Sequence, residues 1–236
     1  MNIYITSPLP KAGKTFVSIG LCAVMQSLGY NTGYYKPVLT GAEINGNKLY
    51  SAETAFANEI DPYIKRHATY TFTSEAFPAF AASEDNVLIE TKKIKAEYDV
   101  MSANTDVLTV EAPGGLLTPI STDIMAYKLP LLFKIPSLFV ITPDTGNINT
   151  LLNEINTARM FGAEIKGIVI NNMPAFSFSR EIKAFPKIIE KYSDSKVLGI
   201  ISTINTTPTA NILINEFLNG IDFQTVFGIK IPKLDV

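Results

Sequence analysis

Short apolar runs alternate with longer amphipathic segments along most of the chain. Six runs have the length of a strand and are nearly continuous in apolar residues, as strands buried on both faces are: Ile3–Thr6, Thr32–Lys36, Val107–Glu111, Ser137–Ile141, Ile165–Asn171 and Lys196–Ile201. Apolar residues recurring three or four positions apart predict helices over Lys14–Leu28, Ser51–Glu59, Thr91–Ser102, Asn149–Phe161 and Ser179–Lys191. This alternation predicts an α/β fold, with a doubly wound, mostly parallel sheet and helices on both faces.

Three segments depart from this rhythm. Residues 60–86 are rich in Tyr, Phe, Thr and Ser, and we expect them to form an irregular excursion over the carboxyl edge of the sheet. The tail after Asn205 is weakly patterned, and no structure is predicted for it. The most apolar stretch, Leu129–Val140, is broken by two prolines and a lysine and is shorter than the roughly 20 apolar residues that span a bilayer. We expect it to be a buried strand and its approach.

Composition favours a small-molecule partner. At 236 residues and 47% hydrophobic content, the chain suits one large domain, which we place over residues 1–236. Twenty basic against twenty-two acidic residues give a net charge of −2, so no basic field attracts nucleic acid or a membrane surface. The single cysteine, Cys22, cannot form an intrachain disulfide, and the N-terminus has no secretory pattern. We expect a cytoplasmic protein.

A Gly-Lys-Thr motif follows the first predicted strand and opens the first predicted helix. Residues Ser7–Thr15 therefore lie between a predicted strand and a predicted helix, which is the context that a phosphate-binding loop requires. In such a loop, backbone N–H groups and the helix N-terminus receive phosphate oxygens, Lys14 neutralises β- and γ-phosphate charge, and the Thr15 hydroxyl ligates Mg²⁺. The usual first glycine is replaced by Pro8, which donates no N–H. The alternative is a helix start without a phosphate role.

Two further strands end in charged residues. Val107–Glu111 ends in a carboxylate before a Gly-rich turn and resembles a Walker B strand, so Glu111 would complete a Mg²⁺ shell. Lys36 ends another predicted strand and is followed four residues later by Thr40. Its ammonium group could hold an anionic substrate or stabilise a transferred phosphoryl group. The alternative for Glu111 is a strand-end acid that faces solvent, and the alternative for Lys36 is a solvated surface lysine.

Several groups of residues follow one another in a defined order between residue 2 and about residue 204. They are Gly13-Lys14-Thr15, Tyr35-Lys36-Pro37-Val38 with Thr40-Gly41, Val110-Glu111 with Gly114-Gly115 and Thr118-Pro119, Gly146 with Ile148-Asn149, Val169-Ile170-Asn171-Asn172, and Gly199-Ile200-Ile201. In this order and spacing the chain resembles dethiobiotin synthetase. That family makes dethiobiotin from 7,8-diaminopelargonate, CO₂ and MgATP in biotin synthesis, so the resemblance implies a P-loop, ATP-dependent cyclo-ligase.

The resemblance also implies roles for individual residues. Lys14 and Lys36 would be catalytic, stabilising the phosphoryl group and a carbamate, while Mg²⁺ would be held by Thr15 and Glu111, with Glu53 as a further candidate. The implied nucleotide-binding residues are Lys11, Ala12, Gly13, Lys14, Thr15, Phe16, Glu111, Gly114, Asn171 and Asn172. The implied substrate-binding residues are Thr40, Gly114 and Asn149.

Two asparagines have alternative interpretations. Asn171, at the end of its predicted strand, would read the adenine edge, because an amide carries both donors and an acceptor. It could equally form an Asx turn. The family works as a homodimer with its substrate across the interface, which implies that Asn149 serves the neighbouring subunit's site. Asn149 also suits a helix N-cap, and the two roles are compatible.

Some positions differ from the family pattern. Leu9 and Pro10 stand where the family carries an acidic residue and Thr, and a family aspartate that helps ligate Mg²⁺ aligns with Ala52 or, after a one-residue shift, Glu53. Three alternatives therefore stay open. They are a partition-type or regulatory P-loop ATPase, which Pro8 and Leu9 disfavour, a related amide-forming ligase domain, and a catalytically silent nucleotide-binding homologue.

Overall fold

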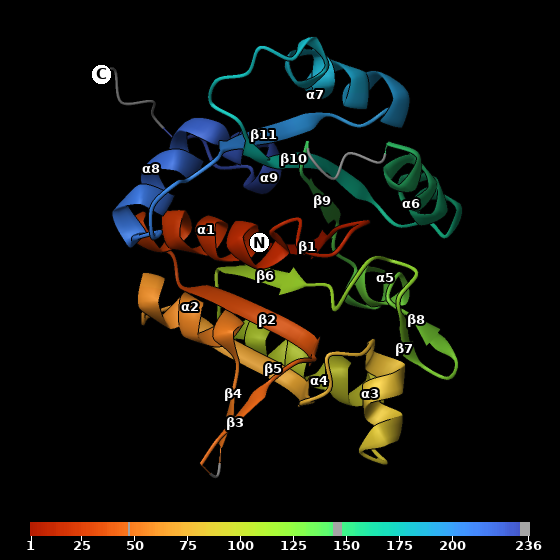
Figure 1. Cartoon of the computed structure of the whole chain (residues 1–236). Helices are drawn as coiled ribbons and strands as arrows, with labels where there is room; N and C mark the ends of the chain where they lie inside the picture. Colours follow the sequence, from red (N-terminus) through yellow and green to blue (C-terminus); the bar gives the residue numbers. More distant parts are fainter. Residues whose placement is uncertain (47, 144–147, 232–236) are drawn as a thin grey trace.

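A sheet of seven parallel strands forms the centre of the computed structural model, which describes residues 1–46, 48–143 and 148–231 (Figure 1). The strands are β1 (Asn2–Thr6), β2 (Thr32–Leu39), β5 (Lys65–Thr71), β6 (Val107–Glu111), β9 (Ser137–Ile141), β10 (Ile165–Met173) and β11 (Val197–Ser202), in the order β11-β10-β9-β1-β6-β2-β5. Two short hairpins accompany it, β3 (Glu43–Asn45) with β4 (Lys48–Tyr50), and β7 (Pro119–Ser121) with β8 (Ile124–Met125). The prediction of a doubly wound parallel sheet is confirmed.

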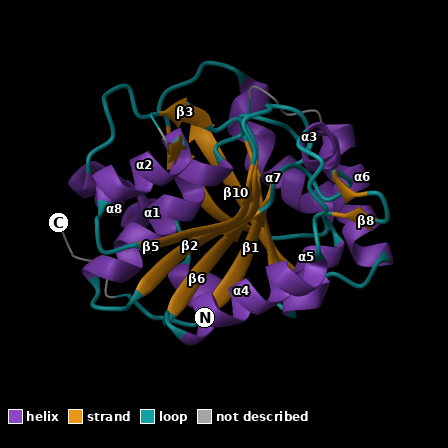
Figure 2. Cartoon of the chain, turned by 90° about the horizontal axis from the view of Figure 1, so that it is seen from below, coloured by secondary structure: helices purple, strands orange, loops and turns teal. Residues whose placement is uncertain are grey.

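Helices cover both faces of the sheet (Figure 2). One face carries α1 (Lys14–Ser27), α2 (Ala52–Ile60), α8 (Ala210–Gly220) and α9 (Phe223–Phe227). The other carries α3 (Pro78–Glu84), α4 (Thr91–Ala103), α5 (Lys128–Phe133), α6 (Ile148–Met160) and α7 (Arg180–Ser193). Successive side chains of β1 point to opposite faces, as the two-residue period of a strand requires. Ile3 and Ile5 pack in the layer that contains α1, and Tyr4 packs in the layer that contains α4. Within the described ranges, none of these helices has the length and apolar character needed to cross a membrane.

Residues 60–86 are more regular than predicted. They contain the edge strand β5, which pairs with β2 from Gly33↔Lys65 to Leu39↔Thr71, and helix α3. The irregular prediction failed because an edge strand with an exposed side lacks the continuous apolar run of a central strand. The connection 72–77, between β5 and α3, is irregular, as we expected for a segment at the carboxyl edge of the sheet.

The weakly patterned tail forms helices α8 and α9. Thr209 caps α8, with its hydroxyl accepting from the Ile212 N–H, and Leu213 and Phe217 pack four residues apart in the layer that contains α1. This spacing is a helical signal, but it spans too few turns to stand out in the sequence. The stretch Leu129–Val140 comprises most of α5 and the beginning of β9.

Strand β2 is longer than predicted and runs past the end of its neighbour. It was expected to end at Lys36, but it continues through Pro37 to Leu39, pairing with β5 there. The register pairs Tyr35 with Val110, so Lys36 lies level with Glu111, the last residue of β6. The side chain of Lys36 therefore reaches the carboxyl edge of the sheet although the residue lies within a strand.

Candidate functional site

The turn between β1 and α1 is tightly curled. Ser7 is buried, and its hydroxyl donates to the carbonyl oxygen of Leu9 over 2.8 Å. Lys11 and Gly13 adopt left-handed backbone angles, with φ of 60° and 93°. Glycine takes such angles without steric cost. The chain consequently reverses within a few residues and enters α1 at Lys14.

The N-terminus of α1 is open to an anion. Among the residues that the structure describes, no side chain caps its first turn, and the turn itself contains no acidic residue. The first N–H groups of any helix lack intrahelical partners, and the helix dipole is positive there. These two properties make the turn and the start of α1 a suitable receptor for phosphate oxygens.

Asn171 supports this turn from β10. Its Nδ2 donates to the carbonyl oxygen of Ala12 over 3.0 Å, and the amide fills the space that a Cβ on Gly13 would occupy. Asn171 is buried, and its described hydrogen bond joins it to the loop rather than to its own strand, which disfavours the Asx-turn alternative. Any contact of Asn171 with an adenine ring stays a prediction.

Replacing Gly13 by alanine is expected to weaken adenine nucleotide binding at least about tenfold, because the new Cβ meets Asn171 and φ is unfavourable for alanine. Calorimetric titration of the variant measures this loss. Gly29→Ala is the matched control, since Gly29 has a φ of 89° but open space around it. Nucleotide affinity equal to that of the parent protein in Gly13→Ala would contradict the close packing.

Lys36 lies between two carboxylates. Its Nζ contacts the Glu53 carboxylate and lies 3.2 Å from Glu111 Oε1. Glu111 Oε1 also accepts from the Thr15 hydroxyl over 3.0 Å, and its Oε2 accepts from the Tyr34 hydroxyl over 2.7 Å. Lys36 is 6% exposed and Glu111 only 1%. Strands β2 and β6 and helices α1 and α2 thus bring a cation, two acids and two hydroxyls together.

Burial and mutual attraction set the protonation of this cluster. Burial lowers the pKa of Lys36, but attraction by Glu111 and Glu53 outweighs it, so the pKa lies above its ordinary value. Burial and repulsion by Glu111 raise the pKa of Glu53 against the opposing pull of Lys36. Burial lowers the pKa of Lys14, although Glu111 attracts its charge. A phosphate beside Lys14 would favour its protonated form.

The donor atoms fit a hard divalent cation. Thr15, Glu53 and Glu111 offer only oxygen ligands, the type that Mg²⁺ selects. Of the two positions that align with the family aspartate, Ala52 is exposed to solvent, whereas Glu53 faces the cavity and contacts Lys36. The geometry therefore favours Glu53 as the matching acid.

A cavity of about 620 Å³ opens above these residues. Its lining comprises Pro8, Leu9, Pro10, Lys11, Gly13, Lys14, Thr15, Lys36, Thr40, Glu53, Glu75, Ala76, Phe77, Glu111, Ala112, Pro113, Gly114, Gly115 and Thr118. The structure thereby brings together the predicted lysines, the predicted metal ligands and the predicted substrate residues Thr40 and Gly114.

Other predicted site residues lie outside the cavity lining. The Phe16 ring packs against Phe217, with centroids 5.7 Å apart, so only its backbone faces the phosphate turn. Asn172 is exposed, with a φ of 57°. Asn149 is exposed and is the second residue of α6, so the N-cap prediction is wrong. Gly146 falls outside the described residues.

Two supporting side chains were not predicted. Glu154 of α6 is 6% exposed, accepts from the Leu116 N–H and lies 2.7 Å from the position of a Cβ on Gly115. Burial raises its pKa. Its spacing from Leu151, three residues before, puts this acid on the buried stripe of α6, a signal that the sequence does contain. Tyr34, the partner of Glu111, has no comparable signal within a continuous apolar strand.

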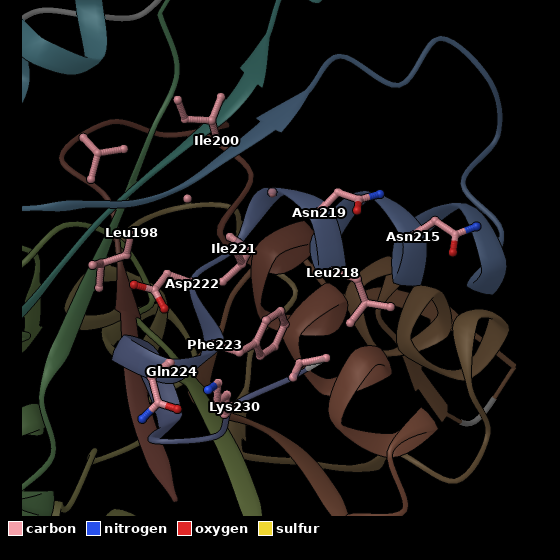
Figure 3. Close-up of a pocket in the computed structure, with 14 residues that line it drawn as sticks. Leu198, Ile200, Asn215, Leu218, Asn219, Ile221, Asp222, Phe223, Gln224 and Lys230 are labelled. Carbon is pink, nitrogen blue, oxygen red and sulfur yellow. The ribbon is translucent and has the colours of Figure 1, made fainter. Parts of the chain in front are cut away.

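A larger hollow of about 910 Å³ lies beside β11, α8 and α9 (Figure 3). Its polar lining includes Asn215, Asn219 and Lys230, and its one acid, Asp222, already caps α9 by accepting from the Thr225 N–H over 3.0 Å. None of its lining residues belongs to the turn between β1 and α1 or to the group formed by Lys36, Glu53 and Glu111. The turn between β1 and α1 and the residues around Lys36 therefore belong to the smaller cavity alone.

Comparisons with known proteins identify the family of the chain. A family model described as an AAA domain matches residues 1–209. An ATP-dependent dethiobiotin synthetase BioD of Caldicellulosiruptor bescii is 30% identical over 223 residues, covering 92% of this chain and 90% of the relative. The same enzyme of Fusobacterium nucleatum is 32% identical over 164 residues, covering 68% of this chain and 74% of the relative.

Solved structures share the fold at low sequence identity. The septum site-determining protein MinD of Pyrococcus horikoshii, complexed with Mg-ADP, aligns with a TM-score of 0.59 at 14% identity, covering 91% of this chain and 85% of that one. A putative plasmid partition protein of Borrelia burgdorferi, bound to AMPPNP, aligns with a TM-score of 0.59 at 18% identity, covering 92% and 94%. At such identities, the likeness supports the fold alone.

Proposed function

The chain belongs to the dethiobiotin synthetase family and is thus an ATP-dependent ligase, and we propose that it closes the ureido ring of dethiobiotin from 7,8-diaminopelargonate, CO₂ and ATP. One observation carries the proposal. Lys36, held between Glu53 and Glu111, shares a cavity with Lys14 and Thr15 at the start of α1. The site thus combines a phosphate receptor with a second cation suited to an anionic substrate.

The proposed reaction has three steps. One amine of the substrate adds to CO₂, losing a proton and forming a carbamate. A carbamate oxygen then takes the γ-phosphoryl group of ATP, releasing ADP. The second amine attacks the carbonyl carbon, loses a proton and expels phosphate as the C–O bond breaks, which closes the five-membered ureido ring.

Phosphate binding falls to the turn and to Lys14. The uncapped N-terminus of α1 offers N–H donors, and Lys14 lies in the same cavity to oppose β- and γ-phosphate charge. We assign the backbone of Lys11, Ala12, Gly13, Thr15 and Phe16 to this receptor. Both contributions act without rearrangement, because the turn is already curled and supported by Asn171.

Lys36 would stabilise the carbamate and the phosphoryl group in transfer. Its two carboxylate partners keep it protonated and fix its position beside Thr40 and Gly114. Mg²⁺, held by Thr15 and Glu111 with Glu53 as the third oxygen ligand, would neutralise charge on the phosphate oxygens. Glu111 is oriented for this task by the Tyr34 hydroxyl.

A homodimer would complete the substrate site. Asn149 lies exposed in the first turn of α6 and does not line the cavity of its own chain. Its position suits contact with a second copy, and we propose that it binds substrate in the neighbouring subunit's cavity. We further propose that Asn171 and Asn172 contact the purine ring of the nucleotide.

ADP release measured with and without the diamine and bicarbonate, coupled to mass detection of product, tests the function. We expect ADP release to require all three substrates and to match the dethiobiotin formed. Omitting bicarbonate provides the control for carbamate formation. Nucleotide hydrolysis that ignores the diamine would contradict the proposal and would fit a partition-type ATPase instead.

A further inference from the structure

Glu75 is an acid of the cavity that the reaction scheme leaves without a role. It belongs to the connection between β5 and α3 and lines the cavity together with Lys36, Thr40 and Gly114. Its side chain is exposed to solvent. The acid thus combines access to solvent with a place on the cavity wall.

Backbone hydrogen bonds fix this wall. The Gly41 N–H donates to the Ser74 carbonyl over 2.8 Å, and the Ala42 N–H donates to the Phe72 carbonyl over 2.9 Å. A Cβ on Gly41 would lie 3.5 Å from Glu75 Cγ. Thr40 directly precedes the hydrogen-bonded residues Gly41 and Ala42. These hydrogen bonds therefore hold Glu75 close to a predicted substrate residue.

The charges of the cavity single out Glu75. The acids in its lining are Glu53, Glu75 and Glu111, and Lys36 pairs with the first and the last. In the described part of the chain, Glu75 has neither a hydrogen bond nor an ion pair from its carboxylate. Its negative charge is therefore available to a ligand, whereas the other two are already engaged.

We propose that Glu75 is a specificity-determining residue that binds the ammonium group of the substrate amine that is not carbamylated. This inference rests on the proposed function. An aliphatic amine has a pKa of about 10 and is cationic near neutral pH. In a vicinal diamine the two nitrogens are on adjacent carbons, so a carbamate beside Lys36 and Thr40 brings the second nitrogen towards the same wall. Glu75 thereby favours diamines over monoamines.

The test uses the full-length protein and Glu75→Gln, which keeps the side-chain shape and removes the charge. A charge-assisted hydrogen bond to an ammonium corresponds to about a tenfold rise in the KM for the diamine. The ammonium must lose its proton before the second amine attacks, so kcat is not the control here. The KM for ATP should change less than about twofold, because Glu75 is proposed to contact the diamine and not the nucleotide. Glu84→Gln, an exposed acid of α3 outside the cavity, is the matched control.

A monoamine analogue that lacks the amine that is not carbamylated gives a second readout when it is tested as a competitive inhibitor of the diamine. It should bind the parent protein and Glu75→Gln equally, since it lacks the group that Glu75 contacts. A diamine KM in Glu75→Gln equal to that of an active parent protein would overturn this inference alone. A parent protein with no diamine-dependent turnover would overturn the proposed function and, with it, this inference.

Discussion

Turnover is expected to fall by about 10³-fold or more when Lys14 is replaced by alanine, since the variant loses the cation that opposes phosphate charge in the transferred group. Lys14 lies at the first position of α1, and its side chain lines the cavity. The change removes a charge and leaves the backbone of the turn in place. Initial rates of ADP release with all three substrates measure the effect.

Lys92→Ala provides the control for Lys14→Ala, because Lys92 is exposed on α4 and is not among the residues that line the cavity. Circular dichroism should show the same helix content in both variants and in the parent protein. Parent-like kinetics in Lys14→Ala would mean that this turn does not bind the reacting phosphates.

Lys36→Met is expected to lose both turnover and stability. The variant leaves Glu111, which is 1% exposed, and the neighbouring Glu53 without their shared cation. Breaking a buried ion pair on one side costs about 3 kcal/mol or more of the free energy of unfolding. Urea denaturation measures the stability, and ADP release measures the activity.

A double variant separates the two effects of Lys36→Met. Adding Glu111→Gln removes the unpaired buried charge, so much of the stability should return. Turnover should stay absent, because neither the cation nor the proposed metal ligand is restored. A Lys36→Met variant as stable as the parent protein would contradict the buried pairing, and an active one would contradict the assigned role of Lys36.

The central strands could be predicted from the sequence because they are buried on both faces and read as continuous apolar runs. Val107–Glu111 and Ser137–Ile141 have the predicted bounds. Strand β5 could not be found in this way, since polar residues such as Lys65, Arg66 and His67 interrupt the apolar run. The extension of β2 past Lys36 was hidden by Pro37, which is tolerated there because β6 has already ended.

The chemistry of the site was partly predictable. The sequence predicted that Lys14, Lys36 and Glu111 lie together, because strand ends and helix starts converge on one edge of a parallel sheet, and all three line one cavity. The contact between Lys36 and Glu53 depends on how α2 packs against α1, which no local pattern encodes. Glu75 was obscured for a similar reason, since its place on the wall depends on hydrogen bonds between the segments after β2 and β5.

The central claim is that the turn after β1, Lys36 and Glu111 surround the triphosphate of ATP. A crystal structure with a non-hydrolysable ATP analogue and Mg²⁺ tests it most directly. We predict phosphate oxygens at the N-terminus of α1, with Mg²⁺ bound by Thr15 and Glu111 and Lys36 facing the γ-phosphate. A nucleotide bound elsewhere, or phosphates remote from Lys36 and Glu111, would contradict the account.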